Sequence, residues 1–204
     1  MAVEENKISG KTWDMMKLYP KSQWTKFLLR LPILTWRLGL GPITGKIFMV
    51  ITTTGRKSGQ PRRVMVEYHK LRGIKYAPCA FGEQAAWYQN ILVDPRVTIQ
   101  TADGSEQVKA ERVTDFDEIL AVFNHFMQMS PAMTKWYFSS LGIEPTPQSL
   151  AVNMEKIYFL RFNPVNTNTP EGLDVDLAWL WPAGIVVFSV LNGIRRLFRK
   201  VFGK

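Results

Sequence analysis

The sequence predicts an α+β protein in which a small antiparallel β-barrel carries flanking helices. Two observations predict this fold class. Five or six short runs rich in β-branched residues follow one another from residue 47 onward, separated by turn signals. Only two or three helical segments accompany them, too few for a doubly wound sheet in which helices alternate with strands. The chain has 204 residues, 46% of them hydrophobic, and can bury one such core.

Turn residues bound the expected strands. The sequence GRKSGQP separates the first two strands, and Asp103-Gly104 is a strong hairpin signal between two later ones. The strands are expected at 47–54, 63–68, 75–79, 97–102, 106–113 and 155–162.

Three segments have helical character. Residues 11–40 place apolar side chains at helical spacing with basic residues between them, and GLGP at 39–42 ends the segment. Residues 85–93 stop before Asp94-Pro95, and residues 115–129 follow Thr114 as an N-cap. We therefore divide the chain into an amphipathic helical segment (1–42), a barrel domain (43–165), and a linker with a hydrophobic and basic tail (166–204).

The positive charge gathers at the C-terminus. The chain has 26 lysines and arginines against 17 acidic residues, a net charge of +9. Five of the cations follow residue 177, where there is no acid: Arg195, Arg196, Arg199, Lys200 and Lys204. This distribution argues against a nucleic-acid-binding protein. The single cysteine and the polar N-terminus without a signal-peptide core indicate a reducing, cytoplasmic location.

The tail itself has the pattern of a membrane-surface helix. Residues 177–194 carry no charge but are at the lower limit for spanning a bilayer, and Pro182 interrupts them. From Leu191 onward an apolar stripe lies opposite a basic one, with Trp179 and Trp181 as interfacial anchors. We expect peripheral binding to the anionic inner face of the cell membrane. A spanning helix is disfavoured by the positive-inside tendency, and docking on another subunit of a homodimer is the other alternative.

The strongest candidate binding site is the sequence TTTGRKSGQPRR at 52–63. Its glycines let the backbone approach a ligand closely, and Arg56, Lys57, Arg62 and Arg63 place four cations within eight residues. Arginine binds phosphate or carboxylate bidentately, so the pattern indicates a phosphorylated cofactor. The spacing is not that of a P-loop, and a solvated basic turn is the alternative.

A second cluster combines small and aromatic residues. The small residues at 77–82 leave room for a flat ring at a strand end, and Trp87 can pack beside it. Ordinary aromatic packing is the alternative.

Together, the sequences ITTTGRKSGQPRRVMVEY and AWYQNILVDPRVTIQ strongly resemble the deazaflavin-dependent nitroreductase family. The resemblance covers roughly residues 30–165 and implies a split β-barrel that uses coenzyme F420 for two-electron hydride transfer. F420 carries a phosphate and an oligoglutamate tail, so the basic turn would meet a ligand of opposite charge. A flavin such as FMN is the less favoured cofactor.

The resemblance also implies the cofactor-binding residues. Arg56, Lys57 and Ser58 would hold the anionic part of the cofactor. The strand along the cofactor would supply Arg62, Arg63, Val64, Met65, Val66 and Glu67. The segment near the ring would supply Ala77, Pro78, Cys79 and Ala80. The segment closing the pocket would supply Ala86, Trp87, Tyr88, Gln89 and Asn90.

This chain departs from the best-known branch of that family on the substrate side. Cys79 and Ala80 stand where that branch has a serine and a lysine near the ring. That branch also has tyrosines on the substrate side near a Met-Tyr-Pro segment, where this chain has Met129-Ser130-Pro131 and then Met133 and Trp136. These replacements disfavour nitroimidazole reduction and indicate an apolar wall suited to a quinone or another lipid. The expected substrate pocket comprises Trp87, Met133, Trp136 and Tyr137, with Tyr137 as the catalytic candidate.

The predicted function is F420H2-dependent hydride transfer to a lipophilic acceptor, a quinone first, at the membrane surface. Reduction of C=C bonds in unsaturated fatty acyl chains or other lipids is one alternative, and non-catalytic binding of F420 or a lipid is another. His69 and His125 are far apart in sequence and fit no metal-ligand spacing, so we expect neither a metal site nor a catalytic histidine.

Overall fold

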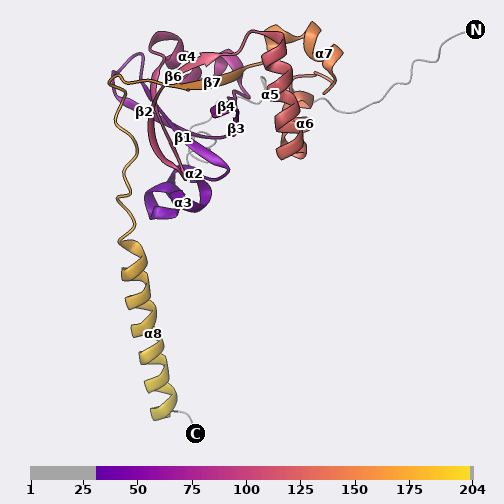
Figure 1. Ribbon diagram of the computed structural model, residues 1–204. Helices are drawn as coiled ribbons and strands as arrows, with labels where there is room; N and C mark the ends of the chain where they lie inside the picture. The colour runs from indigo at the N-terminus through magenta and orange to yellow at the C-terminus, as the bar shows by residue number, and fades with distance from the viewer. Residues whose placement is uncertain (1–30, 203–204) are drawn as a thin grey trace, which may run out of the picture.

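One antiparallel sheet of seven strands forms the centre of the protein, of which the computed structural model describes residues 31–202. The strands stand in the order β2-β1-β5-β6-β7-β4-β3. They are β1 (Phe48–Thr54), β2 (Pro61–Glu67), β3 (His69–Leu71), β4 (Ile74–Pro78), β5 (Arg96–Thr101), β6 (Gly104–Arg112) and β7 (Phe159–Pro164). The sheet curls until β2 also contacts β4, which makes it a split β-barrel with flanking helices (Figure 1). The predicted fold class is confirmed.

The apolar, β-branched run at the start of the barrel became a strand because both of its faces are covered. In β1, every residue from 49 to 53 is buried, as expected of a continuous apolar run. Ile51, Ile99 and Leu160 meet in the cluster that fills the barrel. β1 pairs with β2 from Thr54↔Pro61 to Phe48↔Glu67, so the basic turn lies at one end of this hairpin and Glu67 at the other.

Helices flank the barrel on several sides. The chain enters through α2 (Leu31–Thr35), η1 (Trp36–Leu40) and α3 (Gly41–Thr44), and η2 (Gly82–Gln84) with α4 (Ala86–Val93) covers β1. A separate layer holds α5 (Phe116–Met129), α6 (Pro131–Ser140), α7 (Pro147–Val152) and η3 (Met154–Lys156), drawn at the right of Figure 1. This layer packs around a second apolar core in which Phe138 and Phe159 are fully buried.

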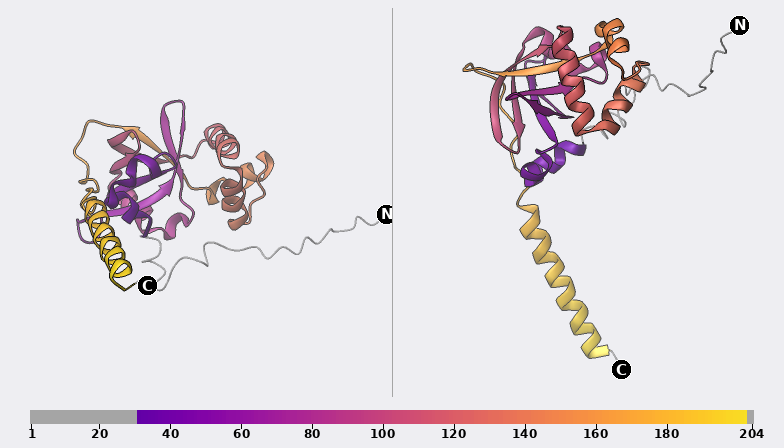
Figure 2. Two further views of the ribbon diagram at one scale, coloured as in Figure 1. Left: turned by 90° about the horizontal axis from the view of Figure 1, so that it is seen from below. Right: turned by 45° about the vertical axis from the view of Figure 1, so that its right-hand side comes forward.

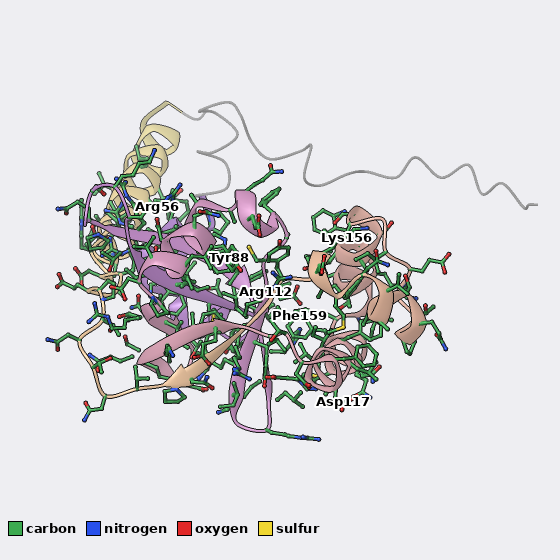
Figure 3. All side chains as sticks on the ribbon, turned by 90° about the horizontal axis from the view of Figure 1, so that it is seen from above. Arg56, Tyr88, Arg112, Asp117, Lys156 and Phe159 are labelled. Carbon is green, nitrogen blue, oxygen red and sulfur yellow. The ribbon has the colours of Figure 1, made fainter. Side chains whose placement is uncertain are left out.

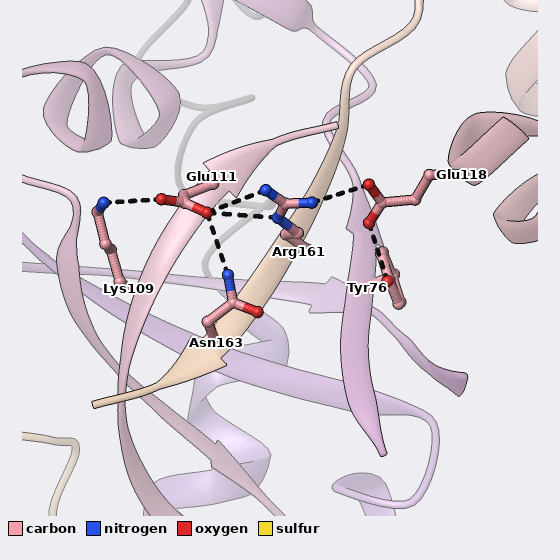
Figure 4. Close-up of polar contacts among 6 residues, drawn as sticks. All are labelled: Tyr76, Lys109, Glu111, Glu118, Arg161 and Asn163. Atoms are coloured by element: carbon pink, nitrogen blue, oxygen red, sulfur yellow. Dashed lines mark hydrogen bonds and ion pairs between the residues drawn. The ribbon is translucent and has the colours of Figure 1, made fainter. Parts of the chain in front are cut away.

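A polar network fixes the helical layer to the barrel (Figure 4). Arg161 on β7 donates to Glu111 on β6 at 3.3 Å and to Glu118 on α5 at 2.8 Å. The hydroxyl of Tyr76 on β4 donates to the other oxygen of Glu118 at 3.0 Å. The start of α5 is thereby held against the outer side of β4 and β7.

Most expected elements are present, with five differences. β3 was not expected from the sequence, and residues 155–158 do not form a strand, because Arg112 takes the carbonyl oxygens of Met154, Glu155 and Ile157 as acceptors. Two unexpected helices, α6 and α7, begin at prolines that suit the first helical turn. GLGP does not end the first helical stretch; Gly39, with φ of 83°, only kinks it. The N-cap of α5 is Asp115, not Thr114.

A strap of irregular chain leads from β7 back across the barrel to the C-terminal helix. Gln100 and Leu173 exchange two hydrogen bonds, Arg37 forms an ion pair with Asp176, and Trp181 Nε1 donates to the carbonyl of Leu38 at 2.8 Å. The helix α8 (Leu180–Phe202) then projects away from the barrel (Figures 1 and 2).

Two predicted segments lie wholly or partly outside the described residues. These are the amphipathic segment up to residue 30 and the basic side chains of the tail beyond residue 192. Within residues 31–202, no helix combines the length and the apolarity needed to cross a bilayer.

Candidate functional site

A pocket of about 960 Å³ runs along the edge strand β2. Its walls come from the β1–β2 turn, α2, α4 and the helices α5 and α6. The volume is within the range of pockets that hold drug-sized ligands and cofactors. Pro61 and Glu67, at the two ends of β2, are separated by about 20 Å at the usual strand rise, so the pocket is long enough to present two different environments.

The basic turn forms one end of this pocket. Gly55 donates to the carbonyl of Gln60 at 2.9 Å, and Gly59 has a φ of 66°, which closes the turn tightly. Arg56, Lys57 and Arg62 all line the pocket here. In Figure 3, Arg56 lies beside α4, on the side of the barrel away from the helical layer marked by Asp117.

The basic end fits an anionic cofactor. Within the described part of the chain, none of Arg56, Lys57, Arg62 and Arg63 forms an ion pair with a carboxylate, so their charges are uncompensated. Arg63 reaches the strap, where it donates to the carbonyl of Gly172 at 2.7 Å, yet its buried Nε has no partner among the described residues. Such a cluster suits the phosphate and carboxylates of the implied F420.

Asn90 on α4 holds the basic turn in place through hydrogen bonds. Its Oδ1 accepts from both the backbone N–H and the guanidinium of Arg56, each at 3.2 Å. Its Nδ2 donates to the hydroxyl of Thr53 at 3.0 Å, and that hydroxyl donates in turn to the carbonyl of Arg62 at 3.2 Å. Asn90 is buried and joins both strands of the hairpin to α4, so it orients the Arg56 side chain.

The middle of the pocket is lined by small and aromatic residues. Pro78, Ala80, Ala86 and Trp87 line it, as do Val64, Met65 and Val66 on the strand. These residues leave a flat, largely apolar space beside the basic end, which suits a planar ring.

Four predicted cofactor-binding residues do not line this pocket: Ala77, Cys79, Tyr88 and Gln89. Cys79 is buried, and burial raises the pKa of its thiol to about 12, which makes it unreactive at neutral pH. The ring of Tyr88 packs edge-on against Tyr158. Ala77, Cys79 and Tyr88 pack in the barrel core behind the pocket wall, and Gln89 donates to the carbonyl of Glu83 at 3.0 Å.

The far end of the pocket is apolar and adjoins the helical layer. Phe126, Met133, Trp136 and Phe159 line it, and Met133 and Trp136 are about half exposed. Tyr137 also lines it, but its buried hydroxyl accepts from the backbone N–H of Tyr158 at 3.2 Å, and burial raises its pKa. The predicted catalytic role of Tyr137 stays a prediction.

Glu67, which the resemblance implies as a cofactor-binding residue, lies at this apolar end in a polar cluster with His69 and Ser130 that the sequence did not predict. Glu67 Oε1 accepts from the hydroxyl of Ser130 at 2.6 Å and lies 3.1 Å from Nε2 of His69. His69 Nε2 is also 3.0 Å from Ser130 Oγ, and the His69 ring stands edge-on to Phe126 and His125. The two-residue spacing of Glu67 and His69 was the available signal, but Ser130 is too distant in sequence to be associated with them.

Comparison with known proteins agrees with the cofactor that the site suits. A model of the family described as F420H(2)-dependent quinone reductase matches residues 38–140. No curated protein matches the sequence. Among solved structures, an F420-H2-dependent reductase (FDR-A) is similar to this chain at 17% identity and a TM-score of 0.45, over 58% of this chain and 95% of its own.

Two further structures share similarity at this level. HutZ, the heme storage protein from Vibrio cholerae, matches at 12% identity and a TM-score of 0.44, over 72% of this chain and 97% of its own. A FAD-binding protein from Mesorhizobium loti matches at 17% identity and a TM-score of 0.41, over 64% of this chain and 89% of its own.

Proposed function

Because the chain belongs to the F420H(2)-dependent quinone reductase family, we propose that it reduces a lipophilic quinone at a membrane surface. It is an oxidoreductase, and its cofactor is coenzyme F420. The observation that carries the proposal is the division of one pocket into an uncompensated basic end and an apolar end along β2.

The proposed division of labour follows from this pocket. When bound, F420H2 supplies the hydride, and the chain supplies binding, orientation and exclusion of water. Arg56, Lys57 and Arg62 would hold the anionic part of the cofactor, with Arg56 oriented by Asn90. Trp87 would then pack beside the ring, on the α4 side of the pocket.

The apolar end would take the acceptor. Phe126, Met133 and Trp136 offer apolar surface to a flat, neutral ring and its lipid tail. The same pocket is lined by Ile33, Leu34 and Arg37, from the elements that hold the root of α8 through the Arg37–Asp176 ion pair. An acceptor that enters from a membrane would therefore reach the pocket beside the tail.

The tail supports a membrane location. Ile185, Val186, Phe188, Val190 and Leu191 are all exposed on α8, and they face in different directions around the helix. A helix that is apolar all round needs an apolar environment, and this one projects away from the barrel (Figure 2). The basic residues that follow in the sequence would contact anionic lipid.

Cofactor titration and product analysis test the proposal. The full-length protein is titrated with F420, with FMN and with neither, and the F420H2-loaded protein is then given a menaquinone analogue or an unsaturated fatty acyl ester. We expect micromolar or tighter binding of F420 and formation of quinol. A saturated acyl product without quinol would replace the quinone by a lipid C=C bond, and oxidation of F420H2 by neither acceptor would contradict the proposed function.

A further inference from the structure

The polar cluster of Glu67, His69 and Ser130 occupies an unexpected place. It lies at the apolar end of the pocket, about 20 Å along β2 from the basic turn that would hold the anionic cofactor. The side chains of Glu67 and His69 are only 11% and 13% exposed. A carboxylate is costly to bury, and it would repel the cofactor's phosphate and carboxylates. Its position favours a role toward the acceptor.

One oxygen of Glu67 is left for a ligand. Oε1 accepts from Ser130 and lies against His69, whereas Oε2 has no hydrogen-bond partner among residues 31–202. Glu67 lines the pocket, as do its strand neighbours Val64, Met65 and Val66, and its contacts with Ser130 and His69 both use Oε1. Oε2 is therefore available to an acceptor at the apolar end.

The surroundings hold this carboxylate in place. Ser130 stands at the N-cap of the ten-residue helix α6, but its hydroxyl donates to Glu67 rather than capping the helix. The N-terminus of α6 adds a partial positive charge close to the carboxylate. The titratable side chains that face His69 are Glu67 from β2 and His125 from α5, whose ring centroid lies 5.9 Å from that of His69.

We propose that Glu67 is the catalytic acid that protonates the reduced acceptor, and that His69 supplies Glu67 with the proton. The inference rests on the proposed quinone reduction. Hydride arrival reduces the quinone by two electrons, at the expense of F420H2, and leaves a negative charge on one oxygen. The O–H bond of protonated Glu67 then breaks and a new O–H bond forms at that oxygen, which gives neutral quinol and the Glu67 carboxylate.

His69 restores the acid. An N–H bond of the His69 imidazolium breaks and its proton passes to Glu67 Oε1 across the 3.1 Å contact. Rotation of the carboxyl group then turns this O–H bond toward the acceptor, and water reprotonates His69. Burial raises the pKa of Glu67, but the hydrogen bonds from His69 and Ser130 lower this pKa by more than burial raises it. The carboxyl group of Glu67 is therefore ionised when no acceptor is bound. A lipophilic acceptor that covers Oε2 increases the burial and so favours the protonated form.

The kinetic test uses three glutamine variants of the full-length protein and a water-soluble naphthoquinone. Glu67→Gln keeps the shape but has no acidic proton to transfer, and we expect kcat to fall about 10²- to 10⁴-fold with the F420 Kd unchanged. Glu67→Asp should recover part of this loss. His69→Gln should lower kcat less than Glu67→Gln does. His125→Gln changes the only other histidine and should leave kcat within about twofold.

A second readout needs neither cofactor nor turnover. In protein labelled with ¹³C at the glutamate carboxyl, the Glu67 signal is identified by its absence in Glu67→Gln. Its titration should move to higher pH in His69→Gln and Ser130→Ala, but not in His125→Gln. An unchanged kcat in Glu67→Gln, or an unshifted Glu67 titration in both His69→Gln and Ser130→Ala, would overturn the proposal. Failure of the wild-type protein to reduce any quinone would instead contradict the proposed function, a result that the titration distinguishes.

Discussion

Asn90 Oδ1 accepts two hydrogen bonds from one residue, from the backbone N–H of Arg56 and from its guanidinium, each at 3.2 Å. This contact joins a buried residue of α4 to the turn that forms the basic end of the pocket. The conformation of a flexible arginine is therefore fixed before any ligand arrives, and fixed donors bind an anion with less loss of entropy.

Replacing Asn90 should weaken both the fold and the cofactor site. Asn90→Ala leaves the Thr53 hydroxyl without its donor and the backbone N–H of Arg56 without its acceptor, which should cost about 1–3 kcal/mol of stability. We expect a lower Tm and weaker F420 binding, with an unchanged KM for the quinone. Gln89→Ala is the matched control, because Gln89 is adjacent on α4 but does not line the pocket. Equal losses in the two variants would contradict this role.

The charge of Lys57 should contribute to cofactor affinity. Lys57 lines the pocket and has no ion-pair partner among the described residues, so Lys57→Gln removes attraction without exposing a carboxylate. We expect the Kd for F420 to rise on the order of tenfold and to depend less on salt concentration. Fluorescence titration at two ionic strengths measures both effects. Lys135→Gln, on the exposed face of α6, should change neither.

Removal of the tail should abolish membrane association and spare the pocket. A cut after Pro182 preserves the contacts of Leu173, Asp176 and Trp181 with the barrel, which a cut at Glu171 would destroy. We expect the truncated protein to bind F420 normally but not to sediment with vesicles of phosphatidylglycerol and phosphatidylcholine. Unaltered sedimentation would exclude the tail as the anchor, and conversion of a dimer into a monomer would support docking on another subunit.

Glu67 should make the protein sensitive to acid. Burial raises the pKa of Glu67, but the donors His69 and Ser130 more than offset this, so the folded-state pKa lies below the ordinary value of 4.5. The ionised side chain therefore contributes stability above pH 4.5, and that contribution is lost as the pH falls through the lower folded-state value. Calorimetry should show a smaller acid-induced drop in Tm for Glu67→Gln. Glu144→Gln, at an exposed position, should retain the wild-type drop.

Much of the fold could be predicted because its signals are local. The β-branched run at 47–54 and the Asp103-Gly104 turn predicted strands that are present as β1, β5 and β6. The strand expected over residues 155–158 is absent for a non-local reason, since Arg112 from β6 takes the carbonyl oxygens of Glu155 and Ile157 as acceptors. No pattern within a short window reports such a partner.

The sequence by itself determined the residues of the basic end of the pocket. The four cations and two glycines of the β1–β2 turn act through local spacing and charge, which are visible without a fold. Only the tertiary structure decided which residues meet at the apolar end, because Ser130 reaches Glu67 across 63 positions of the chain. The same holds for Asn90 and Arg56, which are 34 positions apart and touch only when α4 packs on the barrel. Side chains that meet only through packing leave no pattern of spacing in the sequence from which their contact could be predicted.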